Sequence, residues 1–107
     1  MTADTSTAIW DSPTTRQFVE TLLRIQDEAV LQNFLRDVMT EKEIIEISAR
    51  LEAARMLEVG KKYTEISQAT NLSSRTIARI SDWMQNGRGG YAAVLAHRSH
   101  TLPARAE

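Results

Sequence analysis

Apolar side chains recur every three or four residues along most of the chain, which is the period of an amphipathic α-helix. This pattern predicts a first helix that begins at Pro13 and a second helix from about Asp27 to Met39. No segment alternates apolar and polar residues with the period of two that a half-buried strand shows. The sequence therefore predicts an all-α fold of about six helices.

A third and central helix is predicted from Thr40 to about Val59. Thr40 and Glu43 have the spacing of a capping box, and Gly60 suits the end of the helix. Apolar residues cover two adjacent sides of this segment. That arrangement is typical of a helix that packs on several neighbours or across a dimer interface.

Two short helices joined by a tight turn are predicted at about residues 63–84, the pattern of a helix-turn-helix. Asn71 stands where the turn needs a residue that tolerates a positive φ. Ser73 is a favourable N-cap for the second helix. With Leu72, Ile77 and Ile80 turned toward the body, the opposite side of the second helix must face solvent.

That opposite side offers hydroxyls, a methyl group and two guanidinium groups, which suit the major groove of DNA. Residues around the two helix starts, and one beyond the second helix, suit phosphate. The predicted base-facing residues are Ser74, Arg75, Thr76, Ala78 and Arg79, and the predicted phosphate ligands are Lys61, Lys62, Tyr63, Thr64, Ser73 and Arg88. An αα-hairpin with a solvated polar face is the alternative.

The remaining segments set the domain boundaries. We expect residues 1–12 to be a flexible arm, residues 13–97 to form a single DNA-binding and dimerisation domain, and residues 98–107 to be a flexible tail. The break at residues 86–90 is rich in Gly, and a short last helix should follow it from Tyr91 to about His97.

Charge is unevenly distributed along the chain. Residues 1–59 hold 6 Lys or Arg and 11 Asp or Glu, a formal charge of −5, whereas residues 60–90 hold 5 and 2, a charge of +3. A local basic excess is the footprint expected where a protein meets phosphate, although a solvated basic surface is the alternative.

The sequence gives no sign of a disulfide, a metal site, an active site or a membrane segment. The chain has no Cys, which excludes disulfides and thiolate zinc sites. His97 and His100 lie near the tail without other ligands, so we expect no metal, and no catalytic grouping of residues indicates an enzyme. No segment resembles a signal peptide or approaches the roughly 20 apolar residues of a membrane span. We expect a cytoplasmic protein, associated with the bacterial nucleoid when it binds DNA, without a membrane partner.

A segment of the central helix carries a family resemblance. The run from Arg50 to Gly60, RLEAARMLEVG, together with Tyr63, Ile66, residues 76–80 and Asn86-Gly87, resembles the YerC/YecD branch of the Trp repressor superfamily over about residues 30–97. The resemblance implies an intertwined, all-helical homodimer with one helix-turn-helix on each subunit. It also implies double-stranded DNA as the partner.

The resemblance implies a candidate ligand pocket as well. Its residues would be Thr40, Arg50, Arg79 and Trp83. Ile80 and Trp83 are large where an indole would need room, so we expect no tryptophan binding and no cofactor. The pocket would then bind a different small-molecule corepressor, or no ligand.

The arginines of the central helix have a structural alternative to ligand binding. Glu46 lies four residues before Arg50, and Glu58 lies three residues after Arg55. Both spacings place the two side chains of a pair on one side of a helix. We therefore expect two local ion pairs.

The sequence thus predicts a sequence-specific, double-stranded DNA-binding transcriptional regulator, a repressor that binds a palindromic operator as a homodimer. Two alternatives stay open. One is a dimeric helical module for protein-protein interaction, and the other is a metabolite-responsive regulator whose ligand is not tryptophan. An interaction module would cover the outer face of residues 73–79 in the dimer, whereas a DNA-binding protein would leave it exposed.

Overall fold

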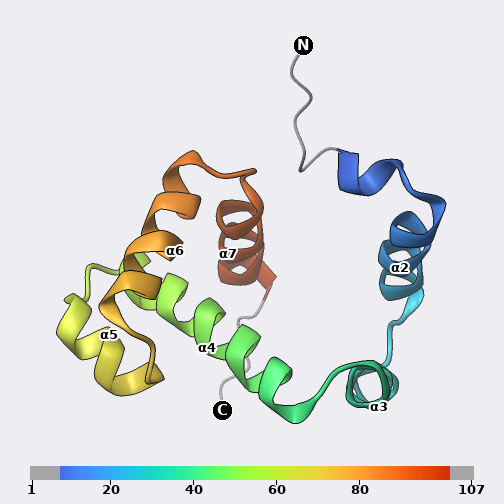
Figure 1. Ribbon diagram of the computed structural model, residues 1–107, viewed down its shortest axis with the longest axis horizontal. Helices are drawn as coiled ribbons and strands as arrows, with labels where there is room; N and C mark the ends of the chain where they lie inside the picture. The colour runs from blue at the N-terminus through green and yellow to red at the C-terminus, as the bar shows by residue number, and fades with distance from the viewer. Residues whose placement is uncertain (1–7, 102–107) are drawn as a thin grey trace. The chain divides into compact units, whose positions relative to one another are not determined.

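The computed structural model describes the backbone of residues 8–101 and the side chains of residues 8–96. Six α-helices follow one turn of 3-10 helix, and the described residues contain no strand (Figure 1). The all-α prediction with about six helices is confirmed. The elements are η1 (Ile9–Asp11), α2 (Pro13–Arg24), α3 (Glu28–Val38), α4 (Glu41–Glu58), α5 (Tyr63–Thr70), α6 (Ser74–Asn86) and α7 (Gly90–Thr101).

The chain divides into two units, Met1–Glu41 and Lys42–Glu107. In the first unit, the Ser12 side chain accepts a hydrogen bond from the amide of Thr14 (3.2 Å) and caps α2. The Thr15 hydroxyl donates to the carbonyl of Ile9, which holds η1 beside the start of α2. Residues 9–11 are therefore helical, where the sequence predicted part of a flexible arm.

The helices of the first unit have no buried residue of their own. Asp27 caps α3 by accepting hydrogen bonds from the amides of Ala29 (2.8 Å) and Val30 (3.2 Å). Large apolar side chains nevertheless stay exposed, among them Phe18 and Leu23 on α2. Both helices are amphipathic, yet the described chain leaves much of their apolar surface uncovered.

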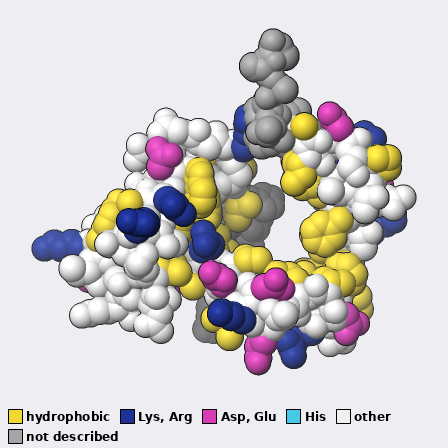
Figure 2. Space-filling model, viewed as in Figure 1, with side chains coloured by type: hydrophobic (Ala, Val, Ile, Leu, Met, Phe, Trp, Pro, Cys, Tyr) yellow, Lys and Arg dark blue, Asp and Glu magenta, His cyan; other side chains and the backbone are white. Residues whose placement is uncertain are grey.

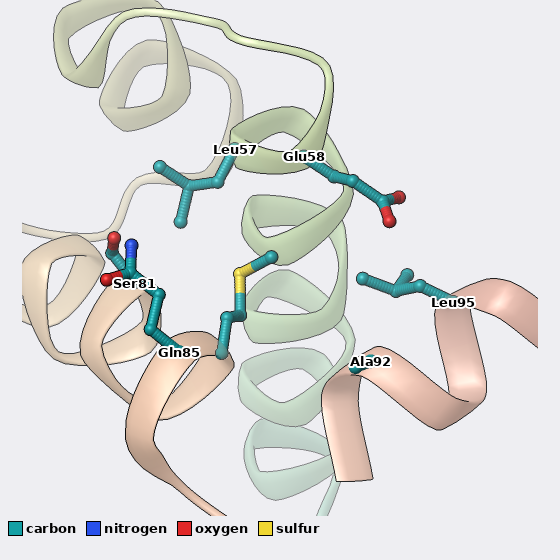
Figure 3. Close-up of a pocket in the computed structure, with 7 residues that line it drawn as sticks. Leu57, Glu58, Ser81, Gln85, Ala92 and Leu95 are labelled. Carbon is teal, nitrogen blue, oxygen red and sulfur yellow. The ribbon is translucent and has the colours of Figure 1, made fainter. Parts of the chain in front are cut away.

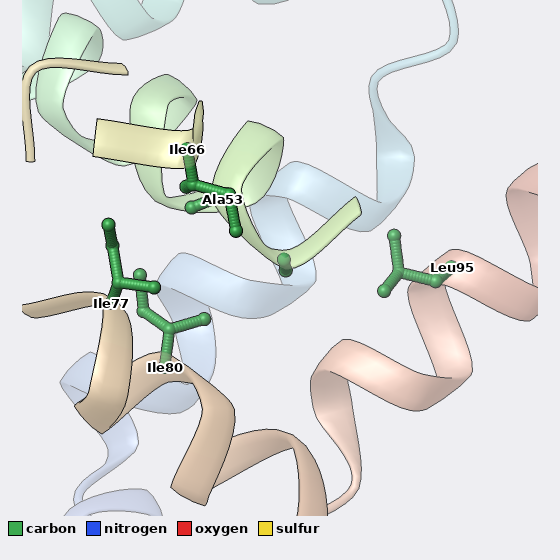
Figure 4. Close-up of a cluster of buried hydrophobic side chains, with 6 residues drawn as sticks. Ala53, Ile66, Ile77, Ile80 and Leu95 are labelled. Carbon is green, nitrogen blue, oxygen red and sulfur yellow. The ribbon is translucent and has the colours of Figure 1, made fainter. Parts of the chain in front are cut away.

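The second unit has a small hydrophobic core to which four helices contribute. Ala53 and Ala54 supply small side chains in the C-terminal half of α4, which allows the other helices to approach closely. Figure 4 shows the cluster of buried side chains. Its members are Ala53, Ala54, Ile66, Ile77, Ile80 and Leu95.

The last helix is longer than predicted. It begins at Gly90 and ends at Thr101, whereas the sequence predicted an end near His97 and a tail from residue 98. No Gly or Pro interrupts the chain between Gly90 and Pro103, so no strong stop signal ends the helix earlier. The side chains of His97 and His100 lie outside the described residues.

The described residues hold neither a membrane-spanning helix nor a cluster of metal ligands. Within residues 8–101, no helix is both long enough and apolar enough to cross a bilayer. In the part of the chain whose side chains are described, no three His, Cys, Asp or Glu residues come together as metal ligands would.

Candidate nucleic-acid interface

The turn between α5 and α6 is fixed by its own hydrogen bonds. Asn71 follows α5 in the left-handed conformation, with φ of 64°, and its amide donates to the carbonyl of Ser67 (2.8 Å). The Ser67 hydroxyl in turn donates to the carbonyl of Leu72 (2.8 Å). The predicted role of Asn71 is confirmed. Ser67 ties the two ends of the turn together, since it accepts from Asn71 through its carbonyl and donates to Leu72 through its hydroxyl.

The start of α6 is capped as predicted. The Ser73 hydroxyl accepts a hydrogen bond from the amide of Thr76 (3.1 Å) and donates one to the Thr76 hydroxyl (3.1 Å). Thr76 is half-buried. Because the Ser73 and Thr76 side chains are bonded to each other, they fix the first turn of α6 and are less available to a ligand than their neighbours are.

The inner side of α6 is held firmly against the second unit. Ile77 and Ile80 have no exposed surface, and they share the core with Ile66 of α5, which has none either. Leu72 is half-buried and packs on the same cluster. All three inward positions expected in the turn and in α6 are therefore found on the inner side.

The outer side of α6 presents the other predicted residues to solvent. Four of the five predicted base-facing residues are exposed, and Thr76 is the half-buried fifth. Within the described residues, neither Arg75 nor Arg79 has an ion pair or a hydrogen bond from its side chain. The exposed four are Ser74, Arg75, Ala78 and Arg79.

Basic side chains surround this helix pair. Lys61 and Lys62 are exposed before α5, and Arg88 is exposed after α6. The nearby acids are engaged locally, since Glu65 accepts from the amide of Lys62 (3.2 Å) and Asp82 accepts from the side-chain amide of Asn86 (2.9 Å). Figure 2 shows Lys and Arg side chains gathered over the α5 and α6 part of the second unit. Tyr63 and Thr64, at the start of α5, are exposed as well.

The arginines of α4 are paired within the helix. Arg50 lies 3.9 Å from Glu46, as predicted. Arg55, however, bonds to Glu52 through its Nε (3.1 Å) and Nη2 (2.9 Å), so the predicted pair with Glu58 is wrong. An acid placed before its base suits the helix dipole better than the reverse order, which favours Glu52 as the partner.

A cavity of about 310 Å³ opens between α4, α6 and α7 (Figure 3). None of the four predicted pocket residues, Thr40, Arg50, Arg79 and Trp83, is among those that line it. Trp83 is 45% exposed on α6 rather than buried in the core of the chain. The cavity is lined by Leu57, Glu58, Ser81, Met84, Gln85, Ala92 and Leu95.

Comparison with protein families extends this picture to most of the chain. The family model described as Trp repressor protein matches residues 14–99. This protein belongs to the Trp repressor family. Along 79 residues, this Trp repressor family member is 33% identical to the uncharacterised protein YerC of Bacillus subtilis, and the match covers 74% of this chain and 76% of YerC. The resemblance to the YerC branch found in the sequence is confirmed.

Solved structures support the same assignment. A TrpR-like protein from Eubacterium eligens superposes with a TM-score of 0.82 at 28% identity, covering 86% of this chain and 95% of that one. A candidate Trp repressor from Staphylococcus aureus gives a TM-score of 0.77 at 26% identity, covering 82% and 88%. The Trp repressor family member described here is thus a helix-turn-helix protein of a DNA-binding, regulatory family, and α5 with α6 form that motif.

Proposed function

We propose that this Trp repressor family member binds double-stranded DNA in a sequence-specific manner, as a homodimer, and represses transcription at a palindromic operator. The exposed outer side of α6 carries the proposal. Ile77 and Ile80 are fully buried, so α6 is held in one orientation. The exposed side chains on its other side are therefore presented together and in a fixed order.

The chemistry of these side chains fits the major groove. Arg75 and Arg79 offer the planar fork that bonds to guanine, and Ala78 offers a methyl that can contact the methyl of thymine. Lys61, Lys62, Tyr63 and Thr64 surround the start of α5, where phosphate contacts would set the position of the protein without selecting a sequence. Ser73 and Arg88 complete the proposed phosphate ligands.

The homodimer is supported by apolar surface that the described chain leaves uncovered. On α4, the side chains of Ile45 and Ile47 are 63% and 56% exposed. Large apolar residues on α2 and α3 are exposed too. Exposed apolar side chains that gather on one surface often belong to an interface. A second copy of the chain is the partner we propose. Two helix-turn-helix motifs related by a dyad would contact half-sites about 34–36 Å apart, so the operator would be palindromic.

Selection of bound sequences from a random duplex pool tests the proposal directly. We expect enrichment of a sequence with dyad symmetry. Binding to that sequence should weaken steeply with salt, because the basic residues of the interface displace counterions from the phosphates. A purified protein that is monomeric, or that binds no duplex at low ionic strength, would contradict the proposal.

Two single variants separate base contact from phosphate contact. Arg75→Ala should lower the affinity for the selected sequence by more than that for random duplex, since it removes a base contact worth about 1–3 kcal/mol. Lys62→Ala should lower both affinities alike and reduce the salt slope by about one. Both are measured by fluorescence anisotropy over a salt series. Equal losses on both duplexes for both variants would refute this assignment of roles.

A further inference from the structure

Arg75 and Arg79 lie four residues apart on the exposed side of α6. Residues at this spacing are neighbours on a helix surface, with Cβ atoms about 5–6 Å apart. Only Ala78, which is also exposed, presents a side chain as small as a methyl group beside them. No bulky exposed side chain lies between the two arginines along α6, and the exposed Trp83 lies four residues beyond Arg79.

Both guanidinium groups are also unengaged within the described residues. Neither forms an ion pair or a side-chain hydrogen bond, whereas Arg50 and Arg55 of α4 pair with Glu46 and Glu52. The closest acid along α6, Asp82, bonds to Asn86 instead. Arg75 and Arg79 therefore keep all their donors for a ligand.

From this pair, and resting on the proposed function, we infer that each half-site of the operator contains two guanines one or two base-pair steps apart, one bonded by Arg75 and the other by Arg79. The spacing follows from two lengths. The Cβ atoms are about 5–6 Å apart, while successive base pairs rise by about 3.4 Å. The arginine fork matches guanine O6 and N7 better than it matches any other base edge.

Phosphate is the competing ligand for these arginines. The interface already holds exposed basic residues at its margins, Lys61 and Lys62 before α5 and Arg88 after α6. Arg75 and Arg79 instead lie on the first half of the exposed side of α6, opposite the buried Ile77 and Ile80. In helix-turn-helix proteins, that part of the second helix meets base edges.

The test uses the duplex selected by the wild-type protein from a random pool. Each guanine of one half-site is replaced in turn by 7-deazaguanine, which keeps normal base pairing but lacks the N7 acceptor. We expect the wild-type protein to lose affinity roughly tenfold at two guanines, which corresponds to about 1.4 kcal/mol per contact. Those two guanines should lie one or two steps apart.

The arginine variants then assign each guanine to a side chain. Arg75→Ala should become insensitive to 7-deazaguanine at one of the two positions only, and Arg79→Ala at the other only. Lys62→Ala serves as the control, since it should bind all duplexes more weakly and stay sensitive at both positions. Both arginines are exposed, so their variants should keep the wild-type melting temperature.

Other outcomes separate this inference from the proposed function. In the first outcome a sequence is enriched but no guanine is sensitive to the substitution, and in the second both arginine variants keep the full wild-type pattern of sensitivity. In either case the arginines bind phosphate and the inference is wrong, while sequence-specific binding stands. Sensitive guanines more than two steps apart would also overturn it. If no sequence is enriched at low ionic strength, the proposed function fails and this inference fails with it.

Discussion

Asn71 adopts a conformation that few residues tolerate, with φ of 64° between α5 and α6. The left-handed region costs an ordinary side chain roughly 1–2 kcal/mol, while Asn and Gly adopt it more readily. Asn71→Ala should therefore lower the free energy of unfolding by about 1 kcal/mol, and Asn71→Gly should change it much less. Urea unfolding followed by circular dichroism measures both. Equal stability of the Ala variant and the wild type would show that the turn relaxes.

Ser73 combines a structural role with a proposed place beside phosphate, and one substitution separates the two. Asp is as good an N-cap as Ser, so Ser73→Asp should keep the free energy of unfolding within about 0.5 kcal/mol of the wild type. The new negative charge should repel phosphate and weaken DNA binding by roughly tenfold. Ser73→Ala is the matched variant, with stability lower by about 1 kcal/mol because the bond to the Thr76 amide is lost. Undiminished DNA binding by Ser73→Asp would place Ser73 away from the phosphates.

Residues whose role depends on the local backbone were predictable from the sequence. Asn71 and Ser73 are examples, because a positive φ and a helix start each favour a short list of residue types. The partner of Arg55 was predicted wrongly as Glu58, since Glu52 and Glu58 both lie three residues away and the sequence offers each of them. The order of charges along the helix, acid before base, was the signal that would have selected Glu52.

At the scale of elements, α6 depends on a core of few residues. Ile80 is fully buried, and Ile80→Ala should lower the free energy of unfolding by about 2–5 kcal/mol through lost burial and the cavity left behind. Val59 is 70% exposed, so Val59→Ala is the control and should change stability by less than about 0.5 kcal/mol. Chemical unfolding measures both variants. A loss of less than about 1 kcal/mol for Ile80→Ala would mean that α6 is not anchored by this side chain.

Helix positions followed from the sequence better than helix ends did. Pro13 and Ser73 mark the starts of α2 and α6 because their chemistry favours the first turn of a helix. The end of α7 at Thr101 was missed, since nothing before Pro103 stops a helix. η1 was missed as well, because the Thr15 hydroxyl that donates to the carbonyl of Ile9 belongs to a residue six positions further on, outside any periodic pattern. The cavity between α4, α6 and α7 depends on how helices pack, which a sequence pattern does not contain.

At the scale of the whole molecule, each of the two units exposes large apolar side chains. The buried core of the second unit draws on the C-terminal half of α4, through Ala53 and Ala54, while Ile45 and Ile47 stay exposed nearer its start. The sequence indicated this by placing apolar residues on two adjacent sides of the central helix. The sequence pattern does not tell whether other helices of the same chain or a second copy of the chain cover these apolar sides, because both arrangements would require the same pattern.

A substitution of Ile47 tests whether a second copy of the chain covers the exposed part of α4. If a second copy covers this side chain, Ile47→Glu should raise the dimer dissociation constant on the order of 100-fold, since a charge would have to be buried without a partner. DNA affinity should fall in parallel, because two half-sites are held together only by a dimer. Sedimentation equilibrium measures the first effect and anisotropy the second. Gln68→Glu adds the same charge at an exposed polar position of α5 and should leave the dimer intact. A dimer unaffected by Ile47→Glu would mean that the proposed copies associate through a different surface.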